Sequence, residues 1–209
     1  MKNDGPDLAF LKVAAITAGA TEAIVISARD IVVEDRVALK CRFGCDEYGK
    51  RWTCPPVVPS VEEFRRMLND YQHAILIKFT SLAVADEETA GCLLRCQYDP
   101  ALGQDLKEKG SKFWSDWMED QRRVHLAILE LERIAFARGF TFAIGFISGP
   151  CSLCEKCNVN AGKCLHPTMA RSAEHAVGVN MKKTAEKVGI PLAFPFRGKP
   201  EPMALLLID

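Results

Sequence analysis

The chain has 209 residues, with 27 basic and 27 acidic side chains, so its formal net charge is zero. Proteins that bind a phosphate backbone usually carry an excess of positive charge, and this balance therefore disfavours nucleic acid as a main partner. The 48% of hydrophobic and 26% of charged residues are typical of a globular chain. We expect a single α/β domain over residues 1–209, with no membrane span, because no stretch approaches ~18 uninterrupted apolar residues.

The N-terminal segment is a weak match to a secretory signal. Asp4 and Asp7 stand where positive charge is expected, and Lys12 interrupts the apolar run. We therefore expect a cytoplasmic protein, in which thiols are kept reduced. The nine cysteines are an odd number and favour metal binding or reactive thiols over a disulfide framework.

The predicted elements alternate between helices and strands. In chain order, the patterns predict a helix over 8–20, strands over 23–27 and 37–40, a helix over 60–71, a strand over 73–80, a helix over 112–138, a strand over 140–147, a helix over 179–188 and a strand over 203–208. Ser60 and Glu63 form a capping box, and Gly139 is a good helix stop. The alternation predicts a mixed or mostly parallel sheet covered by helices, with the cysteine clusters in loops at strand ends.

The first cysteine motif is GPCSLCEKCNVNAGKCLHP. Its cysteines have the spacing C-x₂-C-x₂-C-x₆-C and are Cys151, Cys154, Cys157 and Cys164. Thiolates two residues apart can surround a [4Fe–4S] cluster in one compact loop, as in the bacterial ferredoxin run, although the last gap is longer here. Zinc is the alternative, but its four ligands usually come as two separated pairs. The spacing favours an iron–sulfur cluster over zinc.

The second motif, CRFGCDEYGKRWTCPP, contains Cys41, Cys45 and Cys54. These three cysteines could hold a second cluster whose fourth position is open or filled from elsewhere. In two-cluster ferredoxins the fourth cysteine of the run serves the other cluster, so Cys164 is one candidate for that position. Cys92 and Cys96 are others, and the alternative for them is that they are buried packing residues. It also stays open whether Cys54 only packs and the chain has one shared site.

These two cysteine segments resemble an uncharacterised family of predicted metal-binding proteins, a domain of unknown function common in anaerobic bacteria and archaea. The matching stretches are AIVISARDIVVEDRVALKCRFGC, YGKRWTCPPVVPSVEEF, FISGPCSLCEKCNVNAGKCLHP and AVGVNMKKTAEKVG. The resemblance implies that the ligand candidates are Cys41, Cys45, Cys54, Cys151, Cys154, Cys157 and Cys164. Cys92 and Cys96 are not part of the pattern. After Arg171 the family pattern is a Pro-Ser-Met-Glu-like run, and this chain has Ser-Ala-Glu-His instead.

Other side chains near the motifs allow two interpretations each. His166 either binds the metal or only shapes the turn before Pro167, and Arg171 either neutralises a cluster or is solvated. His125 is expected at the surface or in packing. The tryptophans are expected in the core or at an interface rather than on an electron path. The chain has no G-x-G-x-x-G, Walker or G-x-S-x-G motif, so no nucleotide, flavin or serine chemistry is indicated.

These patterns together predict an iron–sulfur protein with one or two [4Fe–4S] clusters. It would transfer electrons to or from a redox protein, or activate a partner metalloenzyme. Two alternatives stay open: a zinc-stabilised interaction module without a redox role, and an enzyme that binds substrate at an open iron. The sequence leaves open whether the chain forms a homo-oligomer.

Overall fold

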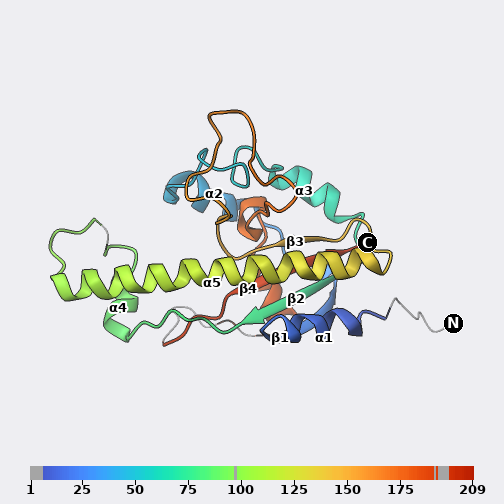
Figure 1. Ribbon diagram of the computed structural model, residues 1–209, viewed down its shortest axis with the longest axis horizontal. Helices are drawn as coiled ribbons and strands as arrows, with labels where there is room; N and C mark the ends of the chain where they lie inside the picture. The colour runs from blue at the N-terminus through green and yellow to red at the C-terminus, as the bar shows by residue number, and fades with distance from the viewer. Residues whose placement is uncertain (1–6, 97, 191, 193–197) are drawn as a thin grey trace.

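The centre of the molecule is a four-stranded sheet (Figure 1). The computed structural model describes residues 7–96, 98–190, 192 and 198–209. The strands are β1 (Ala20–Ser27), β2 (His73–Phe79), β3 (Ile144–Phe146) and β4 (Met203–Ile208), in the order β1-β2-β4-β3. Every neighbouring pair of strands in this sheet is antiparallel.

The predicted mixed or mostly parallel sheet is therefore wrong, although helices and strands still alternate along the chain. A parallel pair requires a connection that carries the chain back to the opposite end of the sheet. The connection between β1 and β2 instead leaves and re-enters the sheet at the same end. The N–H of Ala28, at its start, donates to the carbonyl of Gln72, at its end, at 3.0 Å. The helices between these strands form an insertion rather than a crossover.

A separate hydrophobic core covers each face of the sheet. On one face, alternate residues of β2 and β4 pack against α1 (Ala9–Thr17) and α5 (Gln104–Ala137). On the other face, the intervening residues pack against α3 (Val61–Leu68), the 3-10 helix η2 (Glu174–Val177) and α6 (Met181–Lys187). A strand buried on both faces reads as a continuous apolar run. This explains why β2 and β4 were predictable from sequence.

Two helix predictions rest on capping signals that the structure confirms. At the start of α3, Ser60 Oγ accepts a hydrogen bond from the N–H of Glu63, and the Glu63 carboxylate accepts one from the N–H of Ser60. Gly139 follows α5 with φ +97°, a conformation that glycine adopts without strain. Helix α5 begins at Gln104, whereas the sequence pattern predicts its start at Lys112. The N-cap residue Gly103 has no side chain that could cap the helix, so no local signal marks this start.

The predicted strand over residues 37–40 is wrong, because these residues lie in helix α2 (Asp35–Gly44). A short apolar run does not distinguish a strand from a helix. Here Leu39 is exposed and Cys41 is buried, as on a helix that lies on the surface. Cys41 and Cys45 therefore lie about one turn apart at the end of a helix, and not in a loop after a strand.

The 3-10 helix η1 (Ala28–Asp30) follows β1, and α4 (Glu87–Cys92) packs beneath the first turns of α5 through Leu93 and Phe113. No helix in the described part of the chain is long and apolar enough to cross a bilayer.

Candidate metal centre

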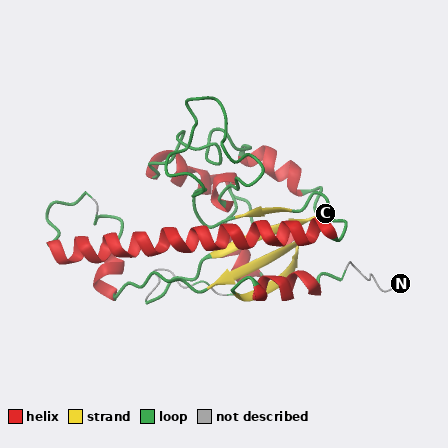
Figure 2. Cartoon of the chain, in the orientation of Figure 1, coloured by secondary structure: helices red, strands yellow, loops and turns green. Residues whose placement is uncertain are grey.

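Two long insertions of the sheet meet on one side of the molecule. Residues 28–72 carry the first group of cysteines, and residues 147–190 carry the second. In Figure 1 the α2–α3 region and the loop after β3 lie together beyond α5, and Figure 2 shows that loops make up much of this region. Because loops have few backbone hydrogen bonds of their own, their position depends on side chains from the regular elements.

Helix α5 anchors the start of the cysteine loop, residues 148–171. Ser148 Oγ donates to Oε1 of the fully buried Gln121 at 2.9 Å. A Cβ at Gly149 would lie 2.8 Å from the same oxygen, so a side chain there would have to displace this buried glutamine. The turn that presents Cys151 is thus fixed by a glutamine that sequence analysis did not select.

The end of the same loop is also held by α5. His125 Nε2 lies 2.8 Å from the carbonyl oxygen of Met169. Burial lowers the pKa of His125, so the neutral ring donates this hydrogen bond at pH 7. Nearby, Arg171 pairs with both oxygens of Glu132, and Glu132 also accepts the N–H of Gly145 at 2.7 Å. Arg171 is therefore neutralised by Glu132 and is not a solvated side chain.

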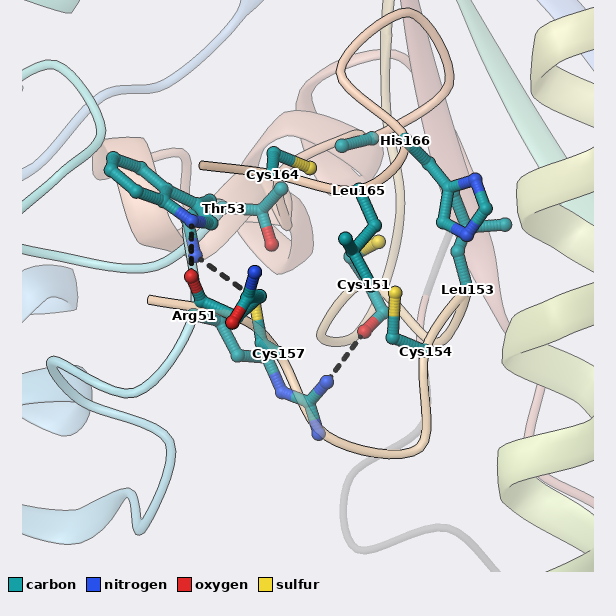
Figure 3. A pocket seen from close by; sticks show the side chains of 12 residues that line it. Arg51, Thr53, Cys151, Leu153, Cys154, Cys157, Cys164, Leu165 and His166 are labelled. Carbon is teal, nitrogen blue, oxygen red and sulfur yellow. Dashed lines mark hydrogen bonds between the residues drawn. The ribbon is translucent and has the colours of Figure 1, made fainter. Parts of the chain in front are cut away.

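The four cysteines of the first motif line one small cavity (Figure 3). The other insertion supplies part of the same wall. The lining residues include Cys151, Cys154, Cys157, Cys164, Leu153, Leu165 and His166 from the cysteine loop, and Arg51, Trp52 and Thr53 from the insertion after β1. Two segments about one hundred positions apart thus enclose four thiols.

Backbone N–H groups point at the cysteine sulfurs of this cavity. The N–H of Trp52 lies 3.5 Å from Cys157 Sγ. Burial raises the pKa of Cys151, and hydrogen bonds from the N–H groups of Leu153 and Arg171 oppose that increase. Such donors stabilise negative charge on sulfur, which is the charge that a thiolate-bound metal requires.

Arg51 lies between the two groups of cysteines. Its Nη1 donates to the carbonyl of Cys151 at 2.9 Å, and its guanidinium binds both oxygens of Glu47. The pKa of Arg51 is raised, mainly by its hydrogen bonds to Glu47. The sequence allowed a charge-neutralising role for Arg171 as one of two interpretations, and the cation that lies beside the cysteines is instead Arg51.

The three cysteines of the second motif line a separate cavity. The lining residues are Cys41, Cys45, Cys54, Glu47, Tyr48, Pro55, Pro150, Ala173, His175 and Ala176. Cys41 and Cys54 are buried, and Cys45 is exposed. Burial, with a smaller contribution from Cys45, raises the pKa of Cys54 to about 12, and burial also raises the pKa of Cys41. In the metal-free chain these buried thiols are protonated, so metal binding would release protons.

The two cavities share a wall. Thr53 lines the first cavity and Cys54 the second, while Pro150 lines the second and Cys151 the first. Each of these two peptide units therefore joins a residue of one lining to a residue of the other. The arrangement makes the two cysteine groups neighbours.

The donor set fits a thiolate-bound metal, and two hydroxyl groups beside it have no hydrogen-bond partner. Thr53 Oγ1 and Ser152 Oγ are buried without a partner among the described residues. Thr53 lines the first cavity, and Ser152 lies next to Cys151 in the chain. Buried hydroxyls rarely stay unpaired, so a sulfur-containing group in the cavity would supply the missing acceptor.

Cys92 and Cys96 lie outside both cavities. They are buried at the end of α4, with their sulfurs 3.0 Å apart. A Cβ at Gly110 of α5 would lie 2.6 Å from Cys96 Sγ, so this sulfur packs directly against the helix backbone. Their position agrees with the packing alternative and does not bring them to the other cysteines.

The other sequence candidates have different surroundings. His166 lines the first cavity. Trp52 also lines this cavity, and its Nε1 donates to the carbonyl of Asn158 at 3.3 Å. Trp114 and Trp117 pack in the hydrophobic cluster between α4 and α5.

Residues 24–208 match the model of the family described as predicted metal-binding protein (DUF2284). The chain belongs to this family. The match includes all seven cysteines of the two cavities and confirms the resemblance seen in the sequence. No curated protein and no solved structure has a significant match to the chain. The description of DUF2284 supports metal binding and does not name the metal.

The second cavity of this DUF2284 chain is braced by Glu34, which joins α2 to α6. The Glu34 carboxylate accepts hydrogen bonds from Lys183 at 2.6 Å, Asn180 at 2.7 Å and Arg36 at 2.9 Å. These donors, Lys183 foremost, lower the pKa of Glu34 from about 4.5 to about 2. The ionised carboxylate thus holds the helix that carries Cys41 against the segment that carries His175.

The lowered pKa predicts a loss of stability in acid. A carboxyl group whose pKa is lower in the folded chain stabilises the fold fully above its unfolded pKa, near 4.5, and this contribution disappears as the pH falls through about 2. The free energy of unfolding of the wild type should therefore exceed that of Glu34→Gln at pH 6, and the difference should shrink between pH 4.5 and pH 2. Urea denaturation of the metal-free proteins across this range measures it. A constant difference would contradict the role of Glu34.

Proposed function

We propose that the chain is an iron–sulfur protein that transfers electrons through two adjoining clusters. One [4Fe–4S] cluster would be bound by Cys151, Cys154, Cys157 and Cys164, and a second centre by Cys41, Cys45 and Cys54. The observation that carries the proposal is the shared wall of the two cysteine-lined cavities. Clusters in adjoining cavities could exchange electrons with each other.

The spacing of the thiols supports a cluster rather than a single zinc ion. Within the described residues, no three His, Cys, Asp or Glu side chains are grouped so that they could hold one metal ion. Four thiolates on one zinc, at about 2.3 Å each, would lie only about 3.8 Å apart. In a four-iron cluster each thiolate binds a different iron, so the four cysteine sulfurs stay farther apart than they do around one zinc ion. The four thiols line one cavity, and among the described residues no three of them are grouped to hold a single ion.

Charge and hydrogen bonding support a redox role for these cavities. A cluster supplies reversible one-electron chemistry, and its potential depends on net charge, hydrogen bonds to sulfur and solvent exposure. The N–H of Trp52 and the guanidinium of Arg51 contribute the hydrogen bond and the positive charge at the first cavity. Cys45 is exposed, so the second centre would be accessible to a redox partner protein at the surface.

The metal content of the anaerobically purified protein tests the proposal. We expect about eight iron and eight sulfide per chain, with absorption near ~400 nm that bleaches with dithionite, as thiolate-bound iron requires. A colourless protein with stoichiometric zinc and no sulfide would overturn the proposal and favour a zinc-stabilised module. Anaerobic handling matters because partly exposed clusters are lost in air.

A further inference from the structure

The second cavity contains three cysteine thiols, whereas a closed thiolate site normally has four ligands. Other cysteines do not supply the fourth. Cys164 lines the first cavity, and Cys92 and Cys96 are buried against α5. Cavity-lining Glu47 has both carboxylate oxygens bound to Arg51. The remaining lining side chains with donor atoms are those of Tyr48 and His175, and a neutral imidazole is the commoner metal ligand.

One ring nitrogen of His175 lies near a buried carboxylate, as is common for metal-bound histidines. Its Nδ1 lies 3.5 Å from Oε1 of the neighbouring Glu174, which is 7% exposed. Metal-binding histidines almost always donate their second ring N–H to a carboxylate or carbonyl, which fixes the ring and leaves the other nitrogen for the metal. With Nδ1 on the side of Glu174, Nε2 is the nitrogen left for a metal.

Glu174 itself is held in place by the backbone. Its N–H donates to the carbonyl of Ile147 at 3.1 Å, and its own carbonyl accepts the N–H of Val179 at 3.1 Å. Oε2 of Glu174 is buried and has no hydrogen-bond partner among the described residues. A buried carboxylate that lacks partners is costly unless positive charge lies nearby. An imidazole bound to a metal is a stronger Nδ1–H donor, so ligation of His175 would strengthen its contact with this carboxylate.

On this geometry we propose that His175 Nε2 is the fourth ligand of the second centre, together with Cys41, Cys45 and Cys54, and that Glu174 is its positioning residue. The inference rests on the proposed function, since it requires these cysteines to bind iron. A neutral imidazole in place of a thiolate makes the centre less negative and raises its reduction potential. The second centre would then be the easier of the two to reduce, and electrons would pass from the first centre to the second.

Nitrogen coupling in the reduced protein tests this ligand. Wild-type protein labelled with ¹⁵N-histidine, reconstituted anaerobically with ferrous iron and sulfide and reduced with dithionite, should show a histidine-nitrogen hyperfine coupling in pulsed EPR. The coupling should disappear in His175→Ala. It should persist in the control His73→Gln, which changes a histidine at the start of β2, remote in sequence from both motifs and lining neither cavity.

Two further variants keep the test independent of folding. His175→Cys replaces the imidazole with a thiolate, which can also bind iron, so the iron content should stay at the wild-type value. The nitrogen coupling should be lost, and the potential of one centre should shift to a more negative value. Glu174→Gln should keep the coupling but release iron from the second centre to a chelator about ten-fold faster or more, because the carboxylate strengthens the imidazole as a ligand.

The outcomes separate the two proposals. A wild-type chain that binds two clusters without histidine coupling, or with coupling that survives in His175→Ala, overturns the role of His175 and leaves the proposed function standing. A wild-type chain that takes up no iron and sulfide at all overturns both.

Discussion

Replacing Cys154 and Cys157 together with serine should halve the iron and sulfide content of the anaerobically purified chain, from about eight of each to about four. Both side chains line the first cavity, and neither lines the second. With two of the four thiolates removed, the first cluster has too few ligands, whereas the second centre keeps Cys41, Cys45 and Cys54. Iron and sulfide analysis with visible absorption measures the loss.

The matched control for this double variant is Cys92→Ser with Cys96→Ser. It also removes two thiols. These two are buried next to each other at the end of α4 and just after it, and they line neither cavity. Iron content per folded chain should stay at the wild-type value. Equal losses in both double variants would mean that iron content follows general stability and not these cysteines.

A single change at Cys164 distinguishes the two pairings that the sequence left open. Because Cys164 lines the first cavity, Cys164→Ser should weaken the first cluster and leave the histidine-coupled centre intact. Loss of the second centre instead would indicate the crossed pairing of two-cluster ferredoxins.

The second large effect should follow from Glu132→Gln, which we expect to lower the free energy of unfolding by about 3 kcal/mol. The side chains of Glu132 and Arg171 are only 11% and 15% exposed, so the neutral amide would leave a buried guanidinium without its counter-ion. Urea denaturation of the metal-free protein measures the change. Because Arg171 ends the cysteine loop, iron should also be released to a chelator faster than in the wild type.

Glu130→Gln is the control for this variant. Glu130 lies on the same helix and pairs with Arg133, but both side chains are exposed. Exposed ion pairs contribute little because water and salt screen them, so this variant should remain close to the wild type in stability and in iron release. If the two variants behave alike, the buried pair does not anchor the loop.

Local signals account for the parts of the fold that sequence predicted correctly. The capping box at Ser60 acts within one helical turn, and the apolar runs of β2 and β4 report burial on both faces. The same reasoning failed at α2, because four apolar-rich residues fit a strand as well as a helix. Strand direction also failed, because it depends on where the 28–72 insertion returns to the sheet.

For the candidate site, the sequence by itself determined the family and the seven cysteines, because ligand spacing is written along the chain. That these cysteines bind a metal stays a prediction. Only the tertiary structure decided how they are grouped into two cavities, and only it brought Arg51 and His175 to them. The reason is physical: Trp52 meets Cys157, and Gln121 fixes the turn before Cys151, through contacts between segments far apart in sequence. No local pattern encodes such contacts.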